Sequence, residues 1–242
     1  MNLLTIFVFV LIIVLVYVVY KLMTKSTASV SGFSDASKSL KVPSSNSGSA
    51  TTNNFGYSAW LYIDTWVNSG KNTINKNVIT RCNSANIPLF KLYLDDDQNN
   101  LNLIMKGNES SPCTIRNVQL QKWINITMSV YGNTVDLYLD GKLVRTCIMP
   151  VIPPTLTPST DNLYIGGGYN ISSQTQIMTP SDGDLQGYLS NVIYKATYFT
   201  PEEAWSIYSD GYSGAGMFNF LNSYKLNFSV TKNNQTVGEV SI

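Results

Sequence analysis

The chain has 242 residues, which leaves room for one sizeable domain and a short accessory segment. Its formal net charge is +1, and the residues after position 50 carry 12 basic and 14 acidic side chains, so the sequence offers no basic field for nucleic acid. The chain contains no histidine, which excludes the usual catalytic triads, histidine acid–base chemistry and most zinc sites.

Residues 1–23 predict a transmembrane helix. No charged side chain occurs from Asn2 to Tyr20, and at about 1.5 Å per residue this segment crosses a hydrocarbon core of roughly 30 Å. A cleaved signal peptide is the alternative, but its apolar region is typically only ~7–15 residues long and follows a basic residue, which this chain lacks. We expect membrane contact from Leu3, Phe7, Leu11, Leu15, Tyr17, Tyr20 and Lys21.

Lysine placement indicates the orientation of this segment. No lysine precedes the apolar run and four follow it soon after, which by the positive-inside rule predicts a single-pass membrane protein with its domain in the cytosol. Five N-x-S/T sequons favour the opposite side, although several would arise by chance in so Asn-rich a chain. The sequons begin at Asn108, Asn125, Asn170, Asn227 and Asn234.

The cysteines are three in number, Cys82, Cys113 and Cys147. A secreted disulfide scaffold would have more, and an even count. At most one bridge can form, and we favour three free thiols in a reducing compartment.

Residues 24–50 predict a flexible spacer. They contain ten serines, few aromatic residues and one proline, which is typical of a linker. We expect this segment to hold the following domain away from the bilayer.

Residues 51–212 predict one all-β domain, because short β-type runs alternate with turn residues. The centre is the clearest part: Gly132-Asn133 and Asp140-Gly141 suit two tight hairpins and so predict an antiparallel meander over 123–147. Within it, Val135, Leu137 and Leu139 predict one buried face. Further strands are expected at Tyr57 to Ile63, Asn77 to Cys82, Leu89 to Leu94, Leu101 to Lys106, Asn162 to Gly166 and Tyr188 to Ala196.

One helix is expected after these strands. Thr200 supplies an N-cap hydroxyl, Pro201 occupies the first helical position and Glu203 completes a capping box, with the helix ending near Gly211. We expect residues 213–242 to form a C-terminal extension with a hairpin at Tyr224 to Val230 and Thr236 to Ile242.

An ordered series of motifs resembles one family. The runs are "FGYSAWLYID", "FKLYLDDDQNNLNLIM", "LQKWINITMSVYGNTVDLYLDGKLV", "LYIGGG" and "LQGYLSNVIYKATYFTPEEAWSIY". They are similar to the concanavalin A-like lectin/glucanase superfamily, in its laminin G-like or pentraxin-like branch, over about 55–211. The resemblance implies a two-sheet antiparallel jelly-roll sandwich in which Trp60 and Trp123 are buried. The fold hosts lectins, adhesion modules, hydrolases and structural proteins, so it does not by itself define a function.

Glycosidases of this superfamily use carboxylates two residues apart on one strand, in an E-x-D-x-E run. None of the four glutamates lies in such a run. Asp136 and Asp140 would share one strand face but stand about 13 Å apart at ~3.3 Å per residue, too far for glycoside hydrolysis. We therefore expect no enzymatic activity.

Calcium is the one cofactor with candidate ligands. Laminin G-like and pentraxin-like domains often bind it at loops on the sandwich edge, and calcium takes six to eight oxygen ligands. The alternative is that adjacent aspartates solvate a hairpin tip. The candidates are Asp95, Asp96 and Asp97 in one turn, and Asp182 and Asp184 before Leu185.

Glycan binding would need an exposed aromatic ring on which a sugar stacks. Tyr169, Tyr198 and Tyr212 lie near expected loops and are the candidates.

Together these features predict a membrane-anchored, non-catalytic interaction or structural protein. Asn-rich anchored domains of this kind resemble membrane proteins of large DNA viruses, which implies a minor capsid or virion membrane protein that links a bilayer to neighbouring capsid proteins. The alternative is a cell-surface lectin or adhesion module, which occupied sequons or a Cys113–Cys147 bridge would favour.

Overall fold

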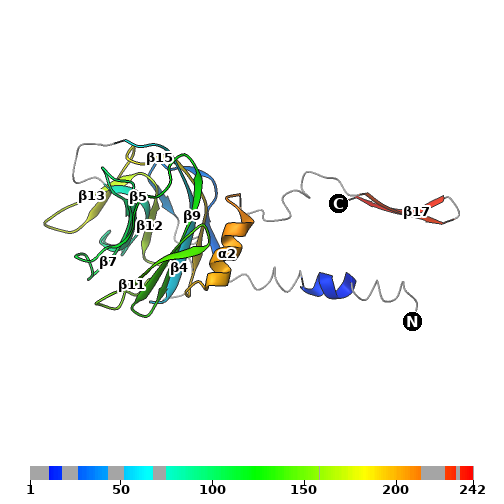
Figure 1. Ribbon diagram of the computed structural model, residues 1–242, viewed down its shortest axis with the longest axis horizontal. Coiled ribbons are helices and arrows are strands. Elements are labelled where there is room, and N and C mark those ends of the chain that lie inside the picture. The colour runs from blue at the N-terminus through cyan, green and yellow to red at the C-terminus, as the bar shows by residue number, and fades with distance from the viewer. Residues whose placement is uncertain are drawn as a thin grey trace.

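The computed structural model describes residues 11–17, 27–42, 52–67, 75–157, 159–213, 227–232 and 235–241. Two antiparallel sheets pack face to face in a sandwich, and one helix lies against the outer side of one of them (Figure 1). The predicted all-β sandwich with a C-terminal helix is confirmed.

Sheet A has the strand order β1-β15-β4-β9-β10-β11, and β2 also pairs with β15. The meander β9-β10-β11 and both of its turns match the prediction, with Gly132 at φ 57° and Gly141 at φ 72°. The strands are β1 (Thr27–Ser31), β2 (Ser34–Asp35), β4 (Phe55–Thr65), β9 (Trp123–Tyr131), β10 (Thr134–Leu139), β11 (Lys142–Ile148) and β15 (Gln186–Lys195).

Sheet B has the order β14-β13-β5-β6-β7-β8, and β12 joins β5 to β3. The short strands β8, β13 and β14 were not expected, because three or four residues give too few positions for an alternating pattern. The strands are β3 (Leu40–Val42), β5 (Asn75–Cys82), β6 (Pro88–Leu94), β7 (Leu101–Met105), β8 (Cys113–Ile115), β12 (Asn162–Ile165), β13 (Gly168–Ile171) and β14 (Met178–Ser181).

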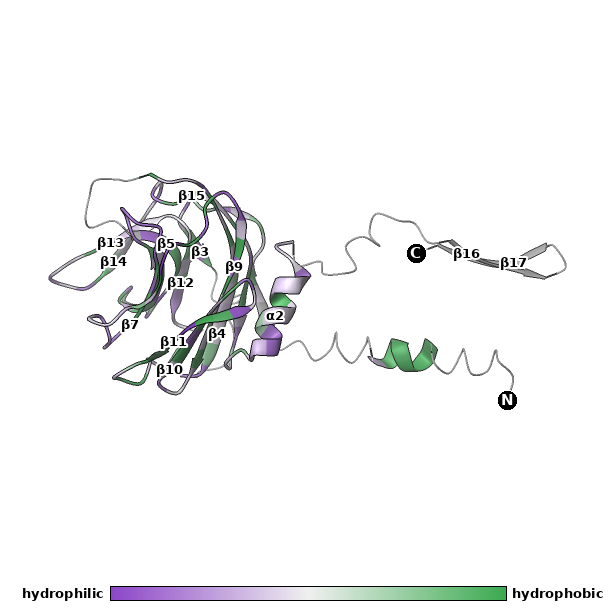
Figure 2. Ribbon diagram, viewed as in Figure 1, coloured by the Kyte–Doolittle hydropathy of each residue, from purple (hydrophilic) through white to green (hydrophobic). Residues whose placement is uncertain are grey.

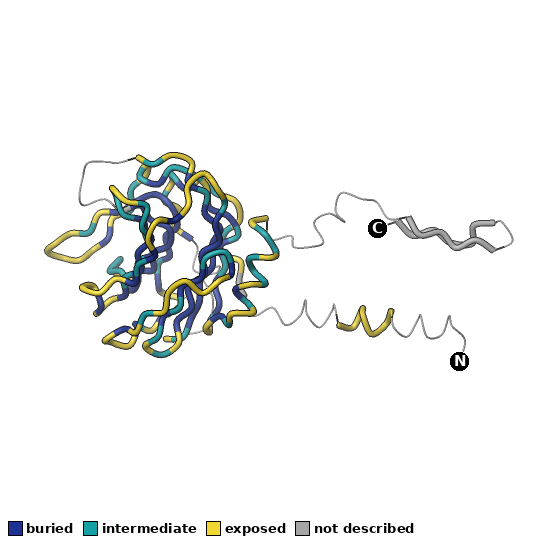
Figure 3. Tube along the Cα trace, viewed as in Figure 1, coloured by how far each residue is buried: buried dark blue, intermediate teal, exposed yellow. Residues whose placement is uncertain are grey.

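The core lies between the two sheets, where Figure 3 shows buried strands and exposed connections. Alternate residues of β10, such as Val135 and Leu137, point into it as predicted. Phe55 of sheet A stacks on Phe90 of sheet B with ring centroids 5.6 Å apart, so aromatic contact joins the two layers.

The serine-rich segment differs from the spacer that we expected. Strand β1 pairs with β15 from Thr27 onward, β2 continues along β15, and β3 pairs with β12. Val30 and Val42 are buried, and the small serines between them fit an edge of the sandwich. The spacer prediction is therefore wrong over 27–42. Only residues 24–26 separate the expected membrane segment from β1.

Helix α2 (Pro201–Asp210) has the predicted capping box, with Thr200 and Glu203 bonded reciprocally. It lies on the face of sheet A that points away from sheet B (Figure 1). Tyr208 of α2 stacks on Trp60 of β4 at 5.7 Å, and Glu203 pairs with Lys195 of β15. Trp60 is buried as the resemblance implied, but beneath α2 on the outer face of the sheet.

The two ends of the chain are only partly described. Residues 11–17 are helical, with Leu11, Leu15 and Tyr17 exposed. Among the described residues, no helix is both long and apolar enough to span a bilayer. Strands β16 (Asn227–Lys232) and β17 (Gln235–Ser241) pair as the expected hairpin. The expected membrane contacts Leu3, Phe7, Tyr20 and Lys21 lie outside the described residues.

The expectation of three free thiols is wrong. Cys113 and Cys147 form a disulfide with Cα atoms 5.9 Å apart, and only Cys82 is free and buried. The bridge joins β8, the last strand of sheet B, to β11, the last strand of sheet A. Sequence spacing did not reveal this contact, because the packing of one sheet on the other brings together two cysteines that are 34 positions apart.

Candidate binding surfaces

Two of the first three calcium candidates have partners within the fold. Asp95 accepts a hydrogen bond from Asn102 at 2.6 Å, and Asp96 forms an ion pair with the buried Lys76 at 2.8 Å. Asp97 is exposed. The ammonium group of Lys76 thus occupies the place beside Asp96 that a cation would need.

Asp182 and Asp184 also have internal partners. Asp182 accepts a hydrogen bond from the backbone N–H of Ser39 at 2.7 Å, and Asp184 accepts one from the Ser181 hydroxyl at 2.8 Å. The first bond attaches the β14–β15 turn to the segment between β2 and β3, and the second lies within the turn. Within the described part of the chain, no three Asp, Glu, Cys or His side chains gather in a way that could hold a metal ion.

The three glycan candidates do not form one site. Tyr169 of β13 is fully buried on sheet B, and burial raises its pKa well above the ordinary value. The prediction that Tyr169 is an exposed ring on which a sugar could stack is therefore wrong. Tyr198 lies just before α2, where it contacts Tyr131, and Tyr212 lies just after α2. The last two are exposed on the other sheet.

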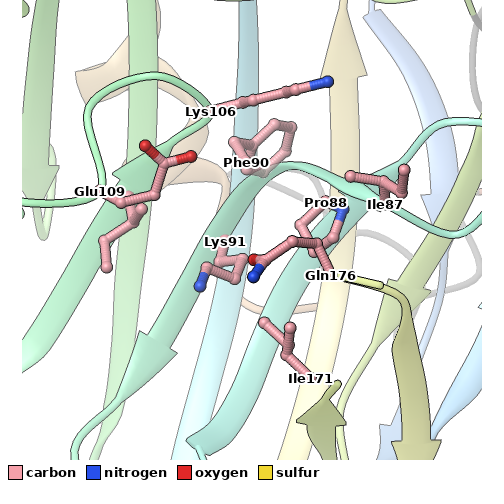
Figure 4. Close-up of a pocket in the computed structure, with 9 residues that line it drawn as sticks. Ile87, Pro88, Phe90, Lys91, Lys106, Glu109, Ile171 and Gln176 are labelled. Atoms are coloured by element: carbon pink, nitrogen blue, oxygen red, sulfur yellow. The ribbon is translucent and has the colours of Figure 1, made fainter. Parts of the chain in front are cut away.

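A shallow hollow lies on the outer face of sheet B, and no sequence motif indicated it. Figure 4 shows Lys91 and Gln176 at its centre, with Lys106 and Glu109 to one side and Ile171 to the other. Burial lowers the pKa of Lys91, while the negative charge of Glu109 opposes this shift. The hollow therefore combines polar donors with apolar walls, which suits a small polar ligand.

The open edge of sheet A carries exposed apolar side chains. Strand β11 pairs with β10 alone among the described strands, and Figure 2 shows its hydrophobic stretch. Ile148 is 75% exposed, and the following loop continues the pattern. We call this surface the apolar edge; it consists of Leu143, Val144, Ile148, Val151 and Ile152.

A second exposed apolar surface covers the outer face of sheet A beside α2. Tyr188, Tyr62 and Trp123 stand opposite one another on β15, β4 and β9. Trp123 is half-buried on this outer face and not within the sandwich core, which corrects the position that the resemblance implied. We call this surface the aromatic face; it consists of Phe33, Tyr62, Trp123, Tyr188, Trp205 and Tyr212.

Five of the six rings of the aromatic face contact one another, while Trp205 contacts Tyr208 of the same helix. Tyr212 stacks on Trp123 at 4.8 Å with an interplanar angle of 1°, and Phe33 stacks on Tyr188 at 5.3 Å. Alternation along β4 and β9 could have shown that Tyr62 and Trp123 share a face, but the contribution of Phe33 depends on strands that lay inside the expected spacer.

These features define a lectin-like β-sandwich with candidate binding surfaces on both sheets. The chain belongs to the concanavalin A-like lectin/glucanase superfamily, because the laminin G-type family model of that description matches residues 34–193. A search of curated proteins finds no match.

Solved structures are similar to this chain at low sequence identity. The ligand-binding domain of botulinum neurotoxin serotype D, solved with N-acetylneuraminic acid, has a TM-score of 0.52 and 13% identity, over 74% of this chain and 42% of that chain. A Trypanosoma rangeli sialidase has a TM-score of 0.48 and 14% identity, over 68% of this chain and 24% of that chain. The chain thus spans about a quarter of the sialidase and less than half of the toxin domain.

Proposed function

We propose that this protein is a non-catalytic interaction protein, held at a membrane by its N-terminal segment, whose partner protein binds along the apolar edge. The observation that carries this proposal is the exposure of Leu143, Val144 and Ile148 on a strand with a free side. Natural edge strands usually avoid such exposure, because an open apolar edge invites another chain to pair with it.

A partner of matching chemistry would present an extended apolar segment. Backbone hydrogen bonds to β11 would supply affinity, and apolar side chains of the partner would cover Val144 and Ile148. The disulfide at Cys147 fixes β11 to sheet B and so keeps the edge in place before the partner binds.

Two forms of this function differ in where the sandwich faces. A minor capsid or virion membrane protein, which links a bilayer to a protein shell, agrees with the cytosolic side that the lysines predict. A cell-surface adhesion module faces outward. The Cys113–Cys147 bridge supports the outward form, because disulfides persist mainly in oxidising compartments. We therefore propose the adhesion form.

Site-specific photocrosslinking tests the partner surface. A benzophenone side chain is placed at Val144 of the full chain in intact cells, with exposed Asn170 on sheet B as the matched control position. We expect a discrete protein adduct from position 144 and none from position 170. Ile148→Lys should abolish the adduct, whereas Ile177→Lys should not. Equal labelling at both positions, or none at 144, contradicts the proposal.

A second candidate function is glycan binding at the hollow on sheet B. The specific observation is the placement of Lys91 and Gln176 beside the apolar Ile171. The ligand-binding domain of botulinum neurotoxin serotype D, which has a similar fold, was solved in complex with N-acetylneuraminic acid. An acidic sugar is therefore the first ligand to test.

Calorimetric titration with N-acetylneuraminic acid tests this candidate. Lys91→Ala should remove binding, whereas Lys38→Ala, which changes an exposed lysine elsewhere, should leave it unchanged. Absence of heat with the unaltered chain at millimolar sugar, or binding that survives Lys91→Ala, rejects the hollow as an acidic-sugar site.

A further inference from the structure

We propose that the aromatic face is a docking surface for the interfacial region of a lipid bilayer, so that the sandwich lies against the membrane and sheet B points away from it. This inference rests on the proposed function only in that the N-terminal segment holds the chain at a membrane. It adds a contact surface and an orientation.

The first argument is the length of chain that remains. Residues 3–23 are the expected membrane segment, and β1 begins at Thr27. Four residue steps reach at most about 14 Å, at up to ~3.6 Å per residue. The edge of sheet A therefore stands close to the end of the membrane segment, and the domain cannot be carried far from the bilayer surface.

The second argument is which sheet receives this attachment. Strand β1 is the edge strand of sheet A, and its neighbours in order are β15, β4 and β9. These three strands carry Tyr188, Tyr62 and Trp123 on the outer face. With strands about 4.8 Å apart, the row ends roughly 14 Å from β1 across the sheet. Along the strands it is offset from the attachment point, because Thr27 pairs with Lys195 and Tyr188 lies seven residues away on β15, about 23 Å at ~3.3 Å per residue. The aromatic face and the attached strand thus belong to the same sheet, and a bilayer beneath the outer face of that sheet would meet both.

The third argument is the chemistry of the surface. Phe33 is 65% exposed, Trp205 50% and Tyr212 47%, although each is a large ring that water does not favour. Tyrosine and tryptophan are enriched at the headgroup level of membranes, where an apolar ring and a polar group are both satisfied. Phenylalanine beside them adds apolar area.

A sugar fits this surface less well. Trp123 is covered by Tyr212, and Phe33 lies on Tyr188. The ring faces on which a pyranose would stack are therefore already in contact with other rings. The exposed rings are also spread over β15, the β1–β2 connection, the middle of α2 and the residues just after it. A broad surface of this kind suits a planar partner.

Tryptophan quenching in vesicles tests the inference. All four tryptophans, at 60, 66, 123 and 205, lie outside the expected membrane segment, so intrinsic fluorescence reports on the sandwich. The full chain is reconstituted in dioleoylphosphatidylcholine vesicles, with and without lipid that carries a nitroxide on its headgroup. We expect strong quenching, and Trp205→Phe should remove a larger share of it than Trp66→Phe.

A paired variant locates the contact. Phe33→Ser combined with Tyr188→Ser should lose most of the quenching, while Ile177→Ser, which alters another exposed apolar residue beside β14, should keep it. Circular dichroism confirms that each variant is folded. If the paired variant does not fold, quenching of the unaltered chain by the headgroup nitroxide still tests the docking surface.

Flotation of the same vesicles separates the two ideas. A chain that floats and is quenched supports the docking surface. A chain that floats without quenching keeps its membrane tether but overturns the docking surface. A chain that does not float overturns the membrane-held function, and the docking surface with it.

Discussion

Arg81 and Asp161 form an ion pair inside the sandwich, with Arg81 Nε 3.4 Å from Asp161 Oδ2 and Arg81 fully buried. Arg81 also donates to the hydroxyl of Tyr57 at 3.0 Å, and Asp161 accepts from the backbone N–H of Thr157 at 2.7 Å. Burial raises the pKa of Tyr57, and the adjacent guanidinium opposes this shift.

Asp161→Asn should destabilise the fold strongly, because it leaves the Arg81 charge without its buried counterion. We expect a loss of about 3–5 kcal/mol in the free energy of unfolding, measured by urea denaturation. Lys122→Ala is the control, since Lys122 is exposed beside Asp140 and surface pairs contribute at most ~1 kcal/mol. Equal losses of unfolding free energy from the two substitutions would show that the buried pair stabilises the fold no more than a surface pair does.

Thiol counting should distinguish the three cysteines. Burial, followed by the charge of Asp161, raises the pKa of Cys82 to about 12, so this thiol should not react with alkylating reagents in the folded chain. Unfolding without reductant should release one reactive thiol, and unfolding with reductant three. Mass spectrometry after alkylation gives the count, and three labels without reductant would contradict the bridge.

Reduction of Cys113–Cys147 should lower stability by about 4 kcal/mol, as expected for a bridge across 34 residues in the chain-entropy model. Thermal unfolding of Cys113→Ser combined with Cys147→Ser gives the same quantity without reductant. Cys82→Ser is the control for loss of a thiol without loss of a bridge.

Acid should weaken the attachment of α2. Burial raises the pKa of Glu203, but hydrogen bonds from Lys195 and Thr200 outweigh this effect and hold the pKa below 4.5. The folded state therefore binds its proton less readily than the unfolded state. The stability from Glu203 is present above pH 4.5 and is lost as the pH falls through the lowered pKa.

Glu203→Gln should accordingly reduce the difference in melting temperature between pH 6 and pH 3, measured by circular dichroism. Thr200→Ala should cost about 1 kcal/mol at neutral pH through loss of the N-cap. If Glu203→Gln leaves the melting-temperature difference between pH 6 and pH 3 unchanged, other carboxylates cause the loss of stability in acid.

Sequon occupancy should depend on exposure if the sandwich faces outward in a eukaryotic cell. Asn170 is exposed, whereas Asn125 is fully buried and bonded to Ser58, and Asn108 is buried against Val151. Glycopeptide mapping should find a glycan at Asn170 and none at the other two. Together with protease protection, an unmodified Asn170 inside a protected domain would favour the cytosolic form.

The fold was largely predictable because long central strands carry strong alternation. The β9–β10–β11 meander and the α2 capping box follow from local turn and cap chemistry at Gly141 and Thr200. Strands β1 to β3 were missed because their serines have the composition of a linker, and pairing with β15 and β12 outweighs that tendency.

The candidate surfaces were less predictable, since they depend on contacts between distant segments. Nothing in the sequence indicated that Asp96 pairs with Lys76. Tyr169 lies near an expected loop, but Tyr93 and neighbouring residues bury it. The aromatic face required Phe33, Trp123 and Tyr212 to meet from three parts of the chain.

Strand β1 and strand β11 are the two opposite edges of sheet A. A membrane attached ahead of Thr27 and a protein bound along β11 would pull on the sheet from its two sides, so tension would cross every hydrogen-bonded ladder between them. The Cys113–Cys147 link transfers part of that load to β8 and sheet B. The β1–β15 ladder, paired at Thr27, Ala28, Ser29 and Ser31, would be the first to bear that load.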